Sequence, residues 1–157
     1  IAFHEVYKFP AVCIRYFNVF GPRQDPASHY SAVIPRFITA MLRGESPTIY
    51  GDGLQSRDFT YVANVVKANL LACEREEAVG HVMNIACGER YSLLDLHRDL
   101  ATITGKHVEP VFSDARPGDV KHSMAAIDVA RKKLGYAPIV GWAEGLRKTT
   151  EWYKVAG

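Results

Sequence analysis

Three short arginine-containing clusters are the residues of this 157-residue sequence best suited to do chemistry. They are Asn18 with Arg23, Arg57 with Asp58, and the run Arg116-Pro117-Gly118-Asp119. A guanidinium group presents planar, paired donors that match phosphate oxygens, so arginines that converge on one cleft would clamp a pyrophosphate. A carboxylate after the Arg-Pro-Gly turn would accept hydrogen bonds from ribose or sugar hydroxyls. The plainer alternative is that each arginine takes part in a surface ion pair.

The first of these clusters follows a segment with the pattern of a buried strand. Its apolar and aromatic run consists of Val12, Ile14, Phe17, Val19 and Phe20. Such a dense run predicts a strand covered on both faces, and Gly21-Pro22 ends it. Ligands of open α/β sheets bind just beyond the carboxyl ends of the strands, so the pattern places residues 18–23 at a ligand-binding edge.

Strands and helices alternate along the rest of the sequence. The spacing of apolar residues predicts helices at Val33–Gly44, Ala63–Glu77, Ser92–Gly105, Asp128–Leu134 and Leu146–Tyr153. Strands are predicted at Thr48–Tyr50, Arg57–Val62, His81–Ala86 and Val108–Phe112. Ser92 with Asp95 forms a capping box, Asp128 is a predicted N-cap, and Gly135 is a predicted left-handed C-cap. The alternation predicts an α/β fold in which only two strands are apolar enough for a large sheet, beside a smaller mixed α/β lobe.

Composition narrows the classes of partner. With 48% hydrophobic residues and no linker-like stretch, we expect residues 1–157 to form a single compact unit. The 19 basic and 17 acidic residues are well mixed, and this distribution argues against nucleic acid and anionic membranes as partners. No apolar run approaches the roughly 20 residues of a membrane span and no leader opens the sequence, so we expect a cytoplasmic protein.

The cysteines and histidines show no pattern of a metal or nucleophile site. Cys13, Cys73 and Cys87 form no Cys-x-x-Cys motif and lie in or beside apolar segments, so buried, reduced thiols are expected. The six histidines have no acid or cysteine partner at ligand spacing, and no Gly-x-Ser-x-Gly elbow is present.

Three ordered motifs resemble the carboxyl-terminal part of extended short-chain dehydrogenase/reductases. They are Arg15–Gln24, Gly51–Val62 and Arg116–Ser123, and the resemblance also covers Asn84–Gly88 and Lys133–Tyr136. Within that group the sequence is most similar to NAD-dependent 4-epimerases that act on UDP-glucose or UDP-N-acetylglucosamine. The resemblance implies the last strands and helices of a Rossmann-like parallel sheet plus a small mixed α/β substrate-binding lobe.

The same resemblance implies roles for individual residues in binding the nucleotide. Asn18 would contact the substrate diphosphate, and Arg57 and Arg116 would hold it. Asp119 would bind the ribose hydroxyls, and Tyr50 would pack on the base.

Further implied roles concern the ends of the ligand and the cofactor. The backbone around Ala32 and Val33 would meet the uracil or the neighbouring ribose. Ser123 matches a position that lines the sugar pocket, where a small side chain leaves space for an N-acetyl group. Phe17 would sit beside the nicotinamide end of NAD.

Two motifs of the family are absent from this sequence. There is no Gly-x-x-Gly-x-x-Gly loop for the NAD pyrophosphate, and no tyrosine is followed by lysine four residues later. A smaller departure is Asn64, where many relatives have aspartate. The resemblance places the Tyr-x-x-x-Lys pair on a helix whose tail is similar to residues 1–9, so the amino-terminal NAD-binding half is expected to be missing.

These observations favour the UDP-sugar-binding portion of an NAD-dependent 4-epimerase that is inactive alone, from a family whose full-length members pair as homodimers. One alternative is part of a nucleotide-sugar 4,6-dehydratase or decarboxylase. The dehydratases usually have an extra residue between Arg-Pro-Gly and Asp, whereas Gly118 and Asp119 are adjacent here. The other alternative is a non-catalytic nucleotide-sugar binding or assembly module.

Overall fold

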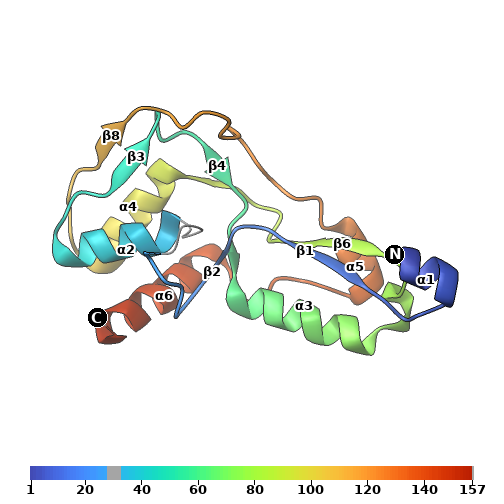
Figure 1. The fold of residues 1–157 in the computed structure, drawn as a ribbon. Coiled ribbons are helices and arrows are strands. Elements are labelled where there is room, and N and C mark those ends of the chain that lie inside the picture. Colours follow the sequence, from blue (N-terminus) through green and yellow to red (C-terminus); the bar gives the residue numbers. More distant parts are fainter. Residues whose placement is uncertain (28–32, 157) are drawn as a thin grey trace.

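The computed structural model describes residues 1–27 and 33–156, and its elements form two groups at opposite ends of an elongated molecule (Figure 1). One group holds α1 (Ala2–Tyr7), β1 (Cys13–Tyr16), α3 (Val62–Glu74), the 3₁₀ turn η1 (Glu76–Ala78), β6 (Val82–Ile85) and α5 (Asp128–Leu134). The other holds α2 (Val33–Arg43), β3 (Thr48–Tyr50), β4 (Ser56–Arg57), β7 (Tyr91–Ser92), α4 (Leu93–Thr104), β8 (Val111–Ser113) and α6 (Trp142–Ala156). Between them lie β2 (Val19–Phe20) and β5 (Thr60–Tyr61).

In the first group, β1 and β6 pair in parallel, with Ile14 opposite Met83. Met83 and Ile85 pack with apolar residues of α3 and α5 in a core of their own. The prediction that the first strand is covered on both faces is wrong for this structure, because no residue of β1 is buried and Arg15 and Tyr16 are exposed. The two helices pack on the Ile14 side of the strands, and among the residues described β1 has β6 as its only partner strand.

In the second group, α2, α4 and α6 pack around a larger apolar core. Helix α2 buries Ile34, Phe37, Ile38 and Met41, which confirms the amphipathic stripe expected there. Strand β3 pairs in parallel with β8, and β4 pairs antiparallel with β7. The result is the small mixed α/β lobe expected beside a parallel sheet.

The segment from Arg57 to Val62 does not form the single half-buried strand that its alternation predicts. Strand β4 pairs with β7, β5 pairs in parallel with β2, and α3 begins at Val62. The two residues between the strands, Asp58 and Phe59, are both buried. The alternation fails as a guide because this segment crosses from one group of elements to the other and is enclosed by both.

The helix ends follow their sequence signals in all but one case. Ser92 and Asp95 form the expected capping box at the start of α4, and Gly105 and Gly135 end α4 and α5 with φ of 69° and 65°. Asp128 is not the N-cap of α5, because it is the first residue of the helix and Ile127 precedes it without a side-chain cap. Its carboxylate instead lies 3.7 Å from Arg131, one turn along.

The three cysteines are free, but the expectation that they are buried is wrong. Cys73 is exposed, and Cys13 and Cys87 are half-buried. Helix α3 turns Ala68 and Leu71 toward the core, and this stripe leaves Cys73 on the outer side. In the part of the chain that the structure describes, no helix has the length and apolarity to cross a membrane.

The capping box predicts a pH-dependent contribution to stability. Hydrogen bonds from the Ser92 hydroxyl and backbone N–H hold the pKa of Asp95 below its usual range, so the contribution is present above the ordinary aspartate pKa of about 3.9 and is lost as the pH falls through the lower folded value. We expect Asp95→Asn to lower the free energy of unfolding at pH 7 by about 0.3–1 kcal/mol, the usual contribution of a carboxylate in the first turn of a helix.

Urea unfolding at a series of pH values checks this prediction, with the exposed Asp114→Asn as the matched control. The difference between wild type and Asp95→Asn should narrow as the carboxylate protonates. A difference that stays constant down to acid pH would show that the charge of Asp95 is irrelevant to the cap.

Candidate functional site

A cavity of ≈ 560 Å³ opens in the second group of elements, between α2, β3, β4 and the loop that follows β8. Its walls mix aromatic, aliphatic and charged side chains. The residues that bring charged, amide or aromatic groups to the wall include Asn18, Arg36, Tyr50, Arg57, Arg116 and Asp119. A pocket of this size and mixed polarity fits a small molecule with both an apolar and an anionic part.

Arg57, on β4, is held in place by several partners. Its Nη2 donates to the Asp119 carboxylate, and its Nη1 donates to the carbonyls of Ser56 at 2.9 Å and Lys121 at 3.3 Å. The side chain is only 17% exposed, against 45% for Asp119. The guanidinium is therefore fixed at the cavity wall before any ligand arrives.

Arg116 lines the same cavity, and its guanidinium lies over the ring of Tyr50. Its guanidinium carbon is 4.0 Å from the ring centroid, a cation–π contact. The Tyr50 carbonyl accepts a hydrogen bond from the Gln55 amide, which fixes the backbone of β3 there. The loop 116–119 is thus attached at both ends, by Arg116 to Tyr50 and by Asp119 to Arg57.

Asn18 reaches the cavity from the junction between β1 and β2. Its φ of 35° is in the left-handed region, which asparagine tolerates better than most residues. The side-chain amide donates to the Asp58 carbonyl at 3.1 Å, and the Asn18 carbonyl accepts from the Thr60 N–H at 3.2 Å. Both its backbone and its side chain are therefore tied to the segment between β4 and β5.

Several lining residues were not found from the sequence, of which Arg36 is the most consequential. It stands one helical turn after Val33 on α2 and donates through Nε to the Pro26 carbonyl at 3.4 Å. The sequence did hold a signal for Arg36 as a site residue, because it lies on the polar side of an amphipathic helix that follows a predicted ligand-binding edge. With Arg36, three arginines and one aspartate line the cavity, a formal excess of two positive charges.

The remaining lining residues that the sequence did not predict as site residues are all uncharged, and most are apolar. They are Phe37, Ala40, Ser46, Pro47, Thr48, Gln55, Phe59 and Leu93. The strand and helix patterns assigned most of them to elements but carried no signal that the elements converge.

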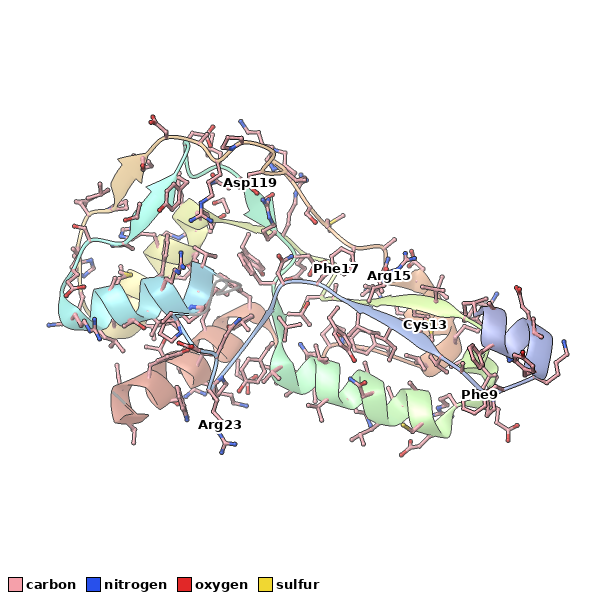
Figure 2. The ribbon with its side chains drawn as sticks, viewed as in Figure 1. Phe9, Cys13, Arg15, Phe17, Arg23 and Asp119 are labelled. Carbon is pink, nitrogen blue, oxygen red and sulfur yellow. The ribbon has the colours of Figure 1, made fainter. Side chains whose placement is uncertain are left out.

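The other predicted site residues lie elsewhere. Val33 lines the cavity, whereas Ser123 does not. The Ser123 N–H donates to the Ser56 carbonyl at 3.0 Å. Phe17 is half-buried beyond the end of β1 and packs against Ala86, Ala125 and Ile127 (Figure 2). Arg23 projects from the turn after β2, away from the cavity (Figure 2). The predicted contact of Ala32 falls outside the described residues.

The arginines and the asparagine amide of the cavity are suited to bind an anionic ligand. Burial raises the pKa of Cys87 to about 11, helped by the negative charges of Asp58 and Glu89, so the thiol stays protonated at neutral pH. Within residues 1–27 and 33–156, no group of three or more histidine, cysteine or acidic side chains is placed to hold a metal.

Comparison with known proteins gives the family. Residues 1–86 match the model of the "NAD dependent epimerase/dehydratase family". The structure is similar to that of UDP-glucose 4-epimerase from the hyperthermophile Thermotoga maritima, with a TM-score of 0.94 and 41% identity over 99% of this chain and 49% of that one. UDP-N-acetylglucosamine 4-epimerase from Methanobrevibacter ruminantium, in complex with UDP-N-acetylmuramic acid, gives a TM-score of 0.91 and 43% identity over 99% and 50%.

A curated relative adds another activity. UDP-N-acetyl-alpha-D-glucosaminuronate decarboxylase from Bacillus cytotoxicus is 32% identical over 92% of this chain and 46% of its own. The chain belongs to the NAD dependent epimerase/dehydratase family. It spans about half the length of the relatives that it matches, and its Rossmann-like α/β fold is theirs.

The left-handed backbone of Asn18 leads to a testable difference between two substitutions. Asn18→Ala and Asn18→Gly both lose the hydrogen bond to the Asp58 carbonyl, but only glycine adopts the positive φ freely. We expect Asn18→Ala to be less stable than Asn18→Gly by about 1–2 kcal/mol, the cost of a left-handed alanine. Urea unfolding of the two variants measures this difference, and equal stabilities would show that Asn18 can leave its positive φ without cost.

Proposed function

We propose that this chain is the nucleotide-sugar-binding portion of an NAD-dependent 4-epimerase, with a UDP-hexose or UDP-N-acetylhexosamine as its ligand. The observation that carries the proposal is the convergence of Asn18, Arg57 and Arg116 on one cavity beside Tyr50. Two solved structures of similar fold, at 41% and 43% identity, are UDP-sugar 4-epimerases. Bidentate guanidinium donors match a diphosphate better than they match any neutral ligand.

In this proposal the ligand's charge lies between Arg57 and Arg116. Arg57 and Arg116 hold the diphosphate with the amide of Asn18, and Asp119 accepts hydrogen bonds from the ribose hydroxyls. Tyr50 packs on the base, with the start of α2 at Val33 beside it. Binding then replaces the Arg57–Asp119 ion pair by a diphosphate on the arginine and a ribose on the carboxylate, so neither charge is left without a partner.

The role of NAD in such an enzyme is to take up and return the hydride at C4 of the sugar. Phe17, just beyond the end of β1, is half-buried and would offer the cofactor one contact at its nicotinamide end. The sequence holds no glycine-rich phosphate loop. The share of this chain is to bind and orient the sugar nucleotide, for which the remote uridine diphosphate supplies the binding energy.

A dehydratase or decarboxylase is the second candidate, favoured by the 32% identity to the decarboxylase from Bacillus cytotoxicus. We prefer the epimerase because the two similar solved structures with the higher identities, 41% and 43%, are 4-epimerases. The adjacent Gly118-Asp119 also lacks the extra residue usual in the dehydratases. Products formed by the whole enzyme distinguish the candidates. From UDP-glucose an epimerase yields UDP-galactose and a dehydratase a 4-keto-6-deoxy sugar, whereas a decarboxylase releases carbon dioxide from a UDP-sugar uronate and leaves UDP-glucose unchanged.

The diphosphate clamp predicts selective losses of affinity. We expect Arg57→Ala and Arg116→Ala each to raise the Kd for UDP by about 10-fold or more, because hydrogen bonds to charged groups contribute about 1.5–3 kcal/mol. Arg23→Ala is the matched control, since Arg23 lies outside the cavity. Isothermal titration with UDP and with uridine makes the measurement, and uridine affinity should change little in all three variants. Equal losses for UDP and uridine would contradict the clamp.

A further prediction concerns catalysis by the 157-residue chain alone. We expect no interconversion of UDP-glucose and UDP-galactose, or of the N-acetylated pair, even with NAD added, because the sequence has no Tyr-x-x-x-Lys pair to move the proton. Chromatography of the sugar nucleotides after long incubation tests this. Turnover by a preparation whose intact mass matches the 157 residues would refute the proposal that this chain binds the sugar nucleotide but does not catalyse its epimerisation.

A further inference from the structure

Asp58 is a buried charged residue for which the proposed function gives no role. It lies between Arg57 and Phe59, both of which line the cavity, but it does not line the cavity itself and is 0% exposed. Among the described residues, none of the lysines, arginines or histidines forms an ion pair with its carboxylate. Burying a carboxylate without a cation costs free energy, so the groups that stabilise Asp58 and their effect on the site matter.

The partners of the Asp58 carboxylate are backbone N–H groups from two distant segments. Oδ1 accepts from Cys87 at 2.9 Å, and Oδ2 accepts from Gly88 at 3.0 Å and from Ala125 at 3.3 Å. Burial raises the pKa of Asp58, while these three donors act in the opposite direction. The carboxylate therefore serves as a three-way acceptor that joins the turn after β6 to the segment before α5.

The backbone on either side of Asp58 carries the other half of the connection. The Asp58 carbonyl accepts the side-chain amide of Asn18 at 3.1 Å, and the Thr60 N–H donates to the Asn18 carbonyl at 3.2 Å. Among the described residues the Asn18 side chain has no other hydrogen bond, so the position of Asp58 sets the direction of its amide. Arg57 precedes Asp58 directly, so its placement depends on the same anchored backbone.

The segment that contains Arg116 and Asp119 is attached at the same place. The Ser56 N–H donates to the Lys121 carbonyl at 2.8 Å, and the Ser123 N–H donates to the Ser56 carbonyl at 3.0 Å. The Ala125 contact to Asp58 continues this row of hydrogen bonds beyond β4. Asp58 is thus linked to each polar group of the diphosphate site. Its carbonyl accepts the amide of Asn18, Arg57 precedes it in the chain, and its carboxylate accepts from Ala125 at the end of the 116–125 segment.

We propose that Asp58 is the positioning residue of the diphosphate site, which sets the affinity for the ligand by holding Asn18, Arg57 and the 116–125 segment in one arrangement without touching the ligand. The proposal rests on the proposed function, because it assumes that these groups bind a diphosphate. It assigns to Asp58 a role distinct from the arginines: they bind the phosphate oxygens, and Asp58 determines where the arginines and the amide stand.

The first test compares Asp58→Asn with a matched buried variant. Asparagine keeps the shape but turns an NH₂ group toward N–H donors. Asn64→Ala is the control, since Asn64 is also 0% exposed, lies outside the cavity and holds the backbone of Ile139 and Val140. Its one bond toward the Asp58 partners goes to the Cys87 sulfur at 3.7 Å and leaves the Cys87 N–H to Asp58, which makes it a stringent control. We expect the Kd of the folded protein for UDP to rise about 10-fold or more in Asp58→Asn and to stay within about twofold in Asn64→Ala.

A double-mutant cycle separates positioning from general destabilisation. If Asp58 acts through Arg57, the combined variant Arg57→Ala/Asp58→Asn should lose clearly less affinity than the product of the two single losses. Losses that multiply would overturn the proposal, as would an unchanged Kd in Asp58→Asn or an equal loss in Asn64→Ala. Failure of the wild-type chain to bind UDP would overturn the proposed function instead, and this inference with it.

A measurement on the wild-type chain keeps the proposal testable where Asp58→Asn does not fold. Coupling between sites is reciprocal, so UDP must stabilise the hydrogen bonds that position its site. We expect hydrogen exchange at the amides of Cys87, Gly88 and Ala125 to slow when UDP binds, although none of these residues lines the cavity. Exchange rates unchanged by saturating UDP would overturn the positioning role.

Discussion

The hydrogen bonds of the buried Asp58 carboxylate are the constraint on which the site depends. They join three segments that are far apart in the sequence: the connection between β4 and β5, the turn at Cys87 and Gly88, and the chain at Ala125. An apolar side chain of similar size would fill the same space without the desolvation cost. It would not fix the direction or the register of the three backbones, because apolar contacts are non-directional.

The cavity shows the effect of that constraint on charge. Arg57 is fixed by two carbonyls as well as by Asp119, and Arg116 lies on the ring of Tyr50, so contacts within the chain hold both cations at the cavity wall. A preorganised site avoids part of the entropy that flexible side chains would lose on binding. The ion pair with Asp119 also keeps the guanidinium partnered until an anion replaces the carboxylate.

Much of the local structure was predictable because it depends on near neighbours. The capping box at Ser92, the left-handed glycines after α4 and α5 and the apolar stripe of α2 are set by residues within a few positions of each other. The clustering of Asn18, Arg57, Arg116 and Asp119 came from the family resemblance, and the structure brings those side chains to one cavity. Whether Phe17 and Ser123 act as the resemblance implies stays a prediction.

The failures have a common physical origin in long-range contacts. The pattern of Arg57–Val62 alternates like a surface strand, but the segment is enclosed from both sides by elements that follow much later in the chain. The burial of β1 depends on what lies against its second face, which its own residues do not specify. Arg36 was missed for the same reason, since nothing near it in the sequence shows that α2 faces the loop at 116–119.

The two main apolar cores explain why a polar connection is needed at all. One core gathers residues of α2, α4 and α6, and the other gathers residues of α3, α5 and β6; in the described part of the chain, Ala86, Ala125 and Ile127 form a small third cluster. The two cores meet at β2, because Phe20 belongs to the first core and Val19 packs against the second. The cavity takes Asn18 from the junction and its arginines from the second group, so its geometry depends on how the two groups are oriented. Directional hydrogen bonds at Asp58, placed where the chain crosses between the groups, fix the direction and register of the backbone at this apolar junction.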